Sequence, residues 1–397
     1  MLRAPQVSTT LGSMARRITR RSLALAAAGI APALAQDQPP AYGGPLEGSS
    51  GKVDPAKFDP VQWTKLRHDS APLKLTFRAE NRKQAEAWQR QLRAKIVELL
   101  GGFPESRTPL GARTLEVLEF PAFQREKFVF ESRPGVGVLG YVITPKNARG
   151  PLPAVICIPG HGRGVDDIVG LDEHGLARTE RRGYEYDFAL QVAEHGMAAV
   201  AIEPMAFGCR RDALTVAKGP TAYACQPVAG SALLLGETMI GWRVYDVMRT
   251  IDWIESRPAL DARKIGCIGI SGGGTCALFS AAVDTRIQAT LVSGYLNTFR
   301  ACIMSMSHCM DNYVPGILKW AEMYDVAGLI APRQLFSEAG DRDPIFPAAA
   351  ARESFEHVKK VYEVFGAPDA VQQEIFPGVH EFHGVRGIPF IAEALKS

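Results

Sequence analysis

The stretch KIGCIGISGGGTCALFS, residues 264–280, decides the fold of this chain. Its first half is a short, unbroken apolar run, which is typical of a strand buried on both faces. Ser271 follows at once, and small and apolar residues continue after three glycines. We therefore predict a strand over 264–270, a tight turn at Ser271 and a helix over 272–283. Such a G-x-S-x-G turn exposes a serine hydroxyl at the carboxyl end of a sheet.

Other segments repeat this alternation of buried strand and helix. Further apolar runs cover 154–160, 197–204, 289–296 and 333–340, and helical segments cover 186–195 and 237–256. This order predicts an α/β fold with a mostly parallel central sheet flanked by helices. Ahead of it, alternating stretches at 114–120, 126–132 and 138–145 predict antiparallel strands at one edge of the sheet.

The N-terminal region has a different character. Residues 1–35 carry Arg20-Arg21 before a short apolar run that ends in Ala33-Leu34-Ala35, the pattern of a twin-arginine signal peptide. We expect a flexible N-terminus over 36–57, a helical extension over 58–110 and the main domain over 111–397. The predicted location is periplasmic or extracellular, without stable insertion into a membrane.

Charge excludes one large class of partner. The chain has 45 basic and 42 acidic side chains, and the first 35 residues hold five arginines and no acid. Without these 35 residues the chain has 40 basic and 42 acidic side chains, so its charge does not predict a nucleic-acid surface. The sequence carries no signal for an oligomeric state.

Two later loops supply the groups that a serine nucleophile needs. Asp341 and Asp343 follow the run 333–340, and His380 and His383 follow the strand-like stretch 371–376. A histidine must accept the serine proton, and a carboxylate must orient that histidine. Either aspartate and either histidine could take these roles by position alone.

These motifs together resemble the α/β-hydrolase superfamily, and within it the acetyl xylan esterases and dienelactone-hydrolase-like serine esterases. GISGGG, GDRDPIFP, FPGVHEFHG and CIPGHG carry the resemblance over about residues 110–395. It implies Ser271 as nucleophile, His380 as general base and Asp343 as the acid. It also implies an oxyanion hole made by the backbone N–H groups of His161 and Gly272.

The resemblance further implies an exported serine hydrolase of carboxylic esters, with acetyl esters of carbohydrates as the first expectation. The reaction that the resemblance implies requires no cofactor and no metal. Methyl uronates, lactones, aromatic esters and peptides are the alternative substrates. A catalytically silent binding protein of the same fold is the alternative outside enzymes.

The sequence also allows predictions for the seven cysteines and for the long segment 297–325. Cys157, Cys267 and Cys276 lie in apolar runs and are expected to be buried, whereas Cys209 with Cys225 and Cys302 with Cys309 could form local disulfides. No cysteine and histidine spacing indicates zinc. Residues 297–325 either line the substrate pocket or form an insertion with a disulfide and a turn.

Overall fold

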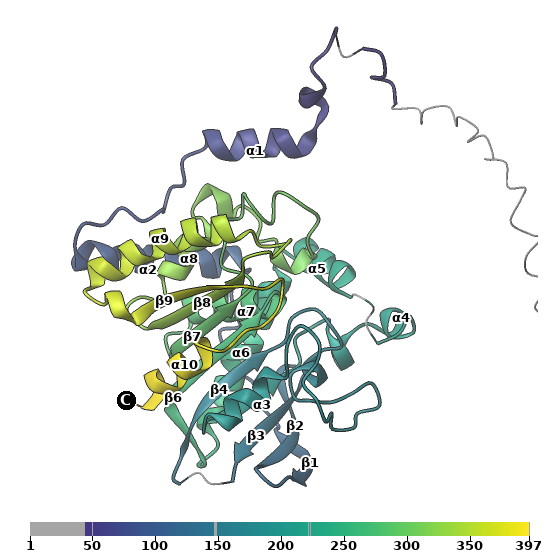
Figure 1. The fold of residues 1–397 in the computed structure, drawn as a ribbon, viewed down its shortest axis with the longest axis vertical. Coiled ribbons are helices and arrows are strands. Elements are labelled where there is room, and N and C mark those ends of the chain that lie inside the picture. Colours follow the sequence, from purple (N-terminus) through teal and green to yellow (C-terminus); the bar gives the residue numbers. More distant parts are fainter. Residues whose placement is uncertain (1–43, 50, 147–148, 221, 223, 397) are drawn as a thin grey trace, which may run out of the picture. The chain divides into compact units, whose positions relative to one another are not determined.

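The computed structural model describes residues 44–49, 51–146, 149–220, 222 and 224–396 (Figure 1). The predicted signal peptide lies outside these residues. The chain separates after Asp59 into two units. The described part of the first unit consists of turns and a short 3-10 helix, Pro55–Phe58, whose N-cap Asp54 accepts a hydrogen bond from the backbone N of Ala56.

One sheet of nine strands organises the described residues of the second unit. The strands run in the order β1-β2-β3-β5-β4-β6-β7-β8-β9. Their bounds are β1 Arg113–Glu119, β2 Phe123–Arg133, β3 Val136–Pro145, β4 Leu152–Ile158, β5 Ala198–Ile202, β6 Leu260–Ile270, β7 Ile287–Ser293, β8 Gln334–Gly340 and β9 Val371–Phe376. The pairs from β1 to β3 and the pair β3–β5 are antiparallel, and every other pair is parallel. The predicted antiparallel edge and parallel centre are therefore confirmed.

Helices cover both faces of this sheet (Figure 1). The helices in the described ranges are α1 Pro60–Ser70, α2 Arg82–Leu99, α3 Phe188–Glu194, α4 Ala213–Val216, α5 Cys225–Leu234, α6 Met239–Glu255, α7 Gly272–Val283, α8 Met323–Gly328, α9 Ala348–Phe365 and α10 Gly387–Lys396, not all of which contact the sheet. Helices α3 and α10 contribute to the core on one face, and α2, α6, α7, α8 and α9 to the core on the other. None of the helices in the described ranges is long and apolar enough to cross a membrane.

The central strands are apolar throughout because both of their faces are buried. In β4, Ala154, Ile156 and Ile158 belong to one core, whereas Val155 and Cys157 belong to the other. Alternating side chains of a strand point to opposite faces, so a strand between two helical layers has no polar face. The sequence pattern is thus a direct consequence of the three-layer arrangement.

The order of strands creates a topological switch beside β4. From β4 the chain crosses one face through α3 to reach β5, and then returns across the other face through α6 to reach β6 on the opposite side of β4. Ligands bind at the carboxyl ends of strands where the winding reverses. The turns after β4 and β6, which carry His161 and Ser271, meet at this point.

Helix α2 packs far from that point along α7. Its Gln89 side chain donates a hydrogen bond to the Ala331 carbonyl at 2.7 Å, and Arg93 Nε donates to the Ala282 carbonyl at 2.9 Å. Ala282 is at the carboxyl end of α7, whereas Ser271 precedes its first residue. Because a helix rises about 1.5 Å per residue, these ends are roughly 16 Å apart. Helix α2 therefore stabilises the end of α7 opposite the candidate site.

Several predicted strand bounds differ from the observed ones, and the stretch 289–296 shows the reason most clearly. The expected strand at 289–296 begins earlier, at Ile287, and ends at Ser293. Gly294 has φ +52°, a left-handed conformation that ends an extended strand. The apolar character continues to Leu296 because Tyr295 and Leu296 are buried in the core beyond the strand.

Candidate active site

Ser271 occupies the sharp turn between β6 and α7. Its backbone has φ +55° and ψ −121°, a conformation that costs a non-glycine residue of order 1–3 kcal/mol. The flanking glycines allow the turn to close. A Cβ atom on Gly269 would lie 2.2 Å from the Gly273 carbonyl oxygen, and a Cβ on Gly273 would lie 2.0 Å from the Ile158 carbonyl oxygen. The G-x-S-x-G spacing is therefore required by backbone contacts on both sides of the serine.

His380 and Asp343 form a hydrogen-bonded pair. Nδ1 of His380 lies 2.7 Å from Oδ2 of Asp343. The other carboxylate oxygen of Asp343 accepts hydrogen bonds from the backbone N–H groups of Ile345 and Phe346, at 2.8 and 3.0 Å. Three donors thus hold one buried carboxylate in a single orientation. The adjacent parallel strands β8 and β9 bring the two loops together.

The alternative residues lie elsewhere. Asp341 is half exposed and accepts a hydrogen bond from the backbone N of Gly378 at 3.0 Å. The ring of His383 stacks on Phe376 with ring centroids 4.4 Å apart, and its Nε2 faces Glu374 at 3.8 Å. Neither residue lines the cavity that contains Ser271.

A cavity of about 340 Å³ joins the predicted residues. Its lining is His161, Tyr184, Ser271, Gly272, Met306, Ser307, His308, Cys309, Asn312, Ile345, Phe346 and His380. The Nε2 atom of His380 is buried and has no hydrogen-bond partner among the described residues. The segment 306–312 forms one wall, which favours the pocket-lining interpretation of residues 297–325. These described lining residues include no Lys or Arg.

The turn after β4 is held against Ser271 by buried polar groups. Tyr184 Oη donates to the His161 carbonyl at 2.8 Å, and the backbone N of Gly160 donates to Glu185 Oε1 at 2.5 Å. A Cβ on Gly160 would lie 3.2 Å from the Cβ of Ser271, which shows how closely the two turns approach. Burial raises the pKa of Glu185 well above its usual range. Sequence reasoning missed Tyr184 and Glu185 because both lie in an irregular segment without a recognisable motif.

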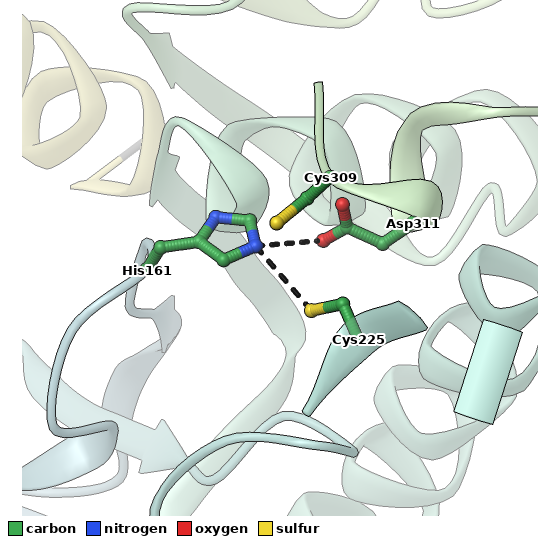
Figure 2. Close-up of side chains that lie close together, drawn as sticks. All are labelled: His161, Cys225, Cys309 and Asp311. Carbon is green, nitrogen blue, oxygen red and sulfur yellow. Dashed lines mark hydrogen bonds and ion pairs between the residues drawn. The ribbon is translucent and has the colours of Figure 1, made fainter. Parts of the chain in front are cut away.

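The side chain of His161 takes part in a second group of residues (Figure 2). Its Nε2 lies 3.4 Å from Cys225 Sγ and 3.5 Å from Asp311 Oδ2, and Cys309 completes the group. Burial opposes a charge on His161, but the Asp311 carboxylate and the Cys225 sulfur outweigh burial and raise the pKa of His161. The hydrogen bond from Cys309 is the main cause that lowers the pKa of Cys225 to about 5. The sequence predicted a role for the backbone of His161 alone.

Neither of the two possible local disulfides is present. All seven cysteines are free. Cys225 lies beside Cys309 and not beside Cys209, which is exposed. Cys302 is buried and its Sγ donates to the Thr298 carbonyl at 2.9 Å. Proximity in the sequence did not predict which cysteines lie close together, because the fold brings the start of α5 next to the 306–312 wall. Cys157, Cys267 and Cys276 are buried, as predicted.

Comparison with known proteins identifies the class to which this fold and site belong. Residues 64–381 match the Abhydrolase family, and the chain belongs to that family. The predicted α/β-hydrolase fold and superfamily are confirmed, and the chain is a hydrolase of this class.

Individual relatives agree with this assignment. A Bacillus subtilis (strain 168) protein, YtaP, provisionally named as a hydrolase, is 28% identical over 301 residues, which are 74% of this chain and 90% of that protein. A Bacteroides fragilis protein, provisionally named as an acetyl xylan esterase, matches 80% of this chain and 82% of its own, with a TM-score of 0.67 and 21% identity. A glucuronoyl esterase from Solibacter usitatus matches 83% of this chain and 98% of its own, with a TM-score of 0.62 and 16% identity. At these identities the two solved structures establish a shared fold.

Proposed function

We propose that this protein is a serine esterase that hydrolyses short-chain acyl esters of carbohydrates, with Ser271, His380 and Asp343 as its catalytic triad. The observation that carries the proposal is the 2.7 Å hydrogen bond between His380 and Asp343 on the cavity that Ser271 also lines. A partly buried Asp–His pair that shares a cavity with a strained serine can supply the base that a hydroxyl nucleophile needs.

The chemistry follows from the atoms that face the cavity. Asp343 accepts the Nδ1 proton of His380, which leaves Nε2 as the basic nitrogen. Nε2 takes the proton of Ser271 Oγ as that oxygen bonds to the ester carbonyl carbon. The resulting tetrahedral intermediate collapses, the leaving alcohol takes the proton from Nε2, and Ser271 remains acylated. Water then repeats the sequence, with His380 as base, and releases the acid and the serine hydroxyl.

The negative charge on the former carbonyl oxygen needs donors that are already oriented. We assign this role to the backbone N–H groups of His161 and Gly272, which belong to the two adjacent turns. Gly272 is the first residue of α7, where N–H groups point out of the helix and favour an anion. Such donors are each worth about 10²–10³ in rate.

The cavity supports a small and uncharged acyl group. Ile345, Phe346 and Met306 supply apolar surface, and His308, Asn312 and Tyr184 supply polar groups beside it. The names of the structural relatives give acetyl xylan and glucuronoyl esters as the substrates of those proteins. We therefore expect acetyl esters of neutral sugars to be preferred, and methyl uronate esters to be the alternative.

A substrate panel tests the proposal. Initial rates on p-nitrophenyl acetate, butyrate and octanoate, acetylated xylan and a methyl glucuronate ester should be highest for acetyl esters. The Ser271→Ala protein should lose at least about 10³-fold in kcat/KM on all of them. Wild-type rates in Ser271→Ala would refute the nucleophile, and a clear preference for octanoate or methyl glucuronate would refute the acyl specificity.

Export is the remaining part of the proposal. The Arg20-Arg21 pair and the Ala33-Leu34-Ala35 pattern support twin-arginine export with Gln36 as the new N-terminus. Cell fractionation followed by N-terminal sequencing measures both features. Changing Arg20 and Arg21 to Lys should retain the uncut chain in the cytoplasm, and processing that is unaffected by this change would argue against the pathway.

A further inference from the structure

Four side chains with metal-binding atoms converge behind the turn that carries His161 (Figure 2). His161 follows β4, Cys225 is the first residue of α5, and Cys309 and Asp311 come from the 306–312 wall of the cavity. Their ligand atoms all lie within 4.8 Å of one another. Cys225 and Asp311 are buried, and His161 and Cys309 are partly buried. This environment differs from an exposed acidic cluster, because it combines nitrogen, sulfur and oxygen donors out of solvent.

The spacing of these atoms suits a tetrahedral ion. Zinc binds thiolate sulfur at about 2.3 Å and imidazole nitrogen or carboxylate oxygen at about 2.0–2.2 Å, so neighbouring ligands of a tetrahedron are about 3.3–3.8 Å apart. Two distances within the group fall in this range: His161 Nε2 is 3.4 Å from Cys225 Sγ and 3.5 Å from Asp311 Oδ2. The ion would therefore need little movement of these three residues.

A neighbouring side chain orients one of these ligands. Asn312 Nδ2 donates to Asp311 Oδ1 at 3.0 Å, which turns the other carboxylate oxygen, Oδ2, towards His161. Metal ligands are commonly held in this way by partners that fix their rotation. If His161 binds the ion through Nε2, the neutral imidazole carries its proton on Nδ1. That nitrogen lies on the side of the ring next to Gly272, 3.0 Å from where a Cβ of that residue would be.

A divalent ion is compatible with the charges around this group. The guanidinium of Arg243 is fully buried, donates to Asp311 Oδ2 at 2.5 Å and lies 3.7 Å from Cys225 Sγ. With an ion bound by both cysteines as thiolates and by the Asp311 carboxylate, Arg243 would balance one of the three negative charges and the ion the other two. The occupied site would then be neutral, as a buried group of charges requires.

We propose that His161, Cys225, Cys309 and Asp311 form a structural site for a zinc-like divalent ion. Four protein ligands close the coordination sphere, as in structural rather than catalytic zinc sites. The ion ties three separate segments together: the turn after β4, the start of α5 and the wall of the cavity. It thereby stabilises the turn beside Ser271, and the site exists whether or not the proposed esterase activity is correct.

Cobalt substitution tests the site in the full-length protein. The protein is stripped with a chelator under reducing conditions and titrated with Co²⁺, which gives thiolate-to-metal absorption and intense visible bands when it is tetrahedrally bound by sulfur. We expect saturation at one equivalent, loss of the bands when Zn²⁺ is added, and a higher melting temperature with either metal. The Ser271→Ala protein should bind Co²⁺ equally well, which separates this site from the catalytic proposal.

Matched variants locate the ligands. Cys225→Ser and Cys309→Ser should each remove the thiolate absorption of that ligand and weaken binding at least about tenfold, because a structural site depends on all of its ligands. Cys209→Ser, which changes an exposed thiol outside the group, should bind Co²⁺ as the wild type does. Circular dichroism shows which variants are folded.

Three results would overturn the proposal. The first is a reduced, folded wild type that gives no thiolate-to-cobalt absorption, which needs no variant to interpret. The second is uptake by Cys225→Ser and Cys309→Ser that equals the wild type. The third is a Cys225–Cys309 disulfide, mapped by mass spectrometry in the protein as isolated, that re-forms in preference to metal binding.

Discussion

Asp343 Oδ2 lies 2.7 Å from His380 Nδ1, while Asp341, two residues earlier, faces the backbone of Gly378. Both aspartates come from the loop after β8, but only Asp343 is buried and held by two backbone N–H groups. An oriented, desolvated carboxylate can fix the tautomer of a histidine, whereas a half-exposed one cannot do so as well. The pair therefore separates two residues that the sequence leaves equivalent.

Replacing Asp343 should reveal its role in orienting His380. We expect Asp343→Asn to lower kcat on p-nitrophenyl acetate by about 10²–10⁴-fold, because an amide does not hold the same tautomer. Asp341→Asn is the matched control and should change kcat less than about threefold, since an exposed hydrogen bond contributes little. Steady-state rates of both proteins show which aspartate orients His380. A larger loss of kcat in Asp341→Asn than in Asp343→Asn would reverse the assignment.

The two histidines of the last loop should differ in the same assay. His380→Gln removes the proposed base, and we expect kcat to fall by at least about 10³-fold with the protein still folded. His383→Gln should retain activity within about fivefold, because His383 stacks on Phe376 and does not line the cavity. Melting temperatures measured alongside the rates identify any loss that comes from unfolding. Equal losses of activity in two folded variants would contradict this prediction.

Gly272 lies against the ring of His161, so a methyl group there should disturb the two turns. A Cβ on Gly272 would lie 2.9 Å from His161 Cε1 and 3.3 Å from Asp311 Oδ2. We expect Gly272→Ala to destabilise the fold by about 1–3 kcal/mol and to lower kcat more than it raises KM.

A matched glycine in another helix isolates that effect. Gly230 lies in α5 and has no atom within 4 Å of its would-be Cβ. Gly230→Ala should be neutral or stabilise the fold by up to about 1 kcal/mol, because alanine favours a helix. Urea unfolding and steady-state rates of both variants provide the measurement. A neutral Gly272→Ala would show that the ring of His161 moves freely.

Glu203 should make stability depend on pH. Burial is the main cause that raises the pKa of Glu203 to about 8, although its carboxylate accepts hydrogen bonds from the backbone N–H groups of Val165 and Cys209. In the unfolded chain the same group has a pKa near 4.5. The folded state therefore binds more protons between these values, and its free energy of unfolding must fall as pH rises from about 4.5 to about 8.

The Glu203→Gln protein isolates this contribution. Glutamine does not titrate. As pH rises through that interval, the unfolding free energy of the wild type should therefore fall relative to that of Glu203→Gln. Urea denaturation at pH 5, 6, 7 and 8 provides the measurement. Glu180→Gln, at an exposed position, is the matched control. If the difference in unfolding free energy between wild type and Glu203→Gln did not change with pH, the raised pKa of Glu203 would be refuted.

The sequence determined the main features of the fold by itself. Continuous apolar runs such as 154–160 and 264–270 predicted strands buried on both faces, because a parallel sheet between helices has no polar face. The start of α7 followed from the glycines around Ser271, since only small residues fit between Ile158 and the strand–helix turn. Local patterns of this kind reflect local steric and hydrophobic requirements.

Only the tertiary structure decided which partners meet. Nothing in the sequence links residues 161 and 225 to the nearby pair 309 and 311, because these three segments are distant in the chain. The reversal of winding at β4 and the return of the 306–312 wall bring them together. The resemblance implied Asp343 as the acid, but the difference in burial and in contacts between Asp343 and Asp341 is visible only in the tertiary structure. Sequence patterns specify the environment of each element, whereas contacts between loops depend on how all the elements pack. This packing produces both the hydrogen-bonded His380–Asp343 pair and the group of four side chains with metal-binding atoms.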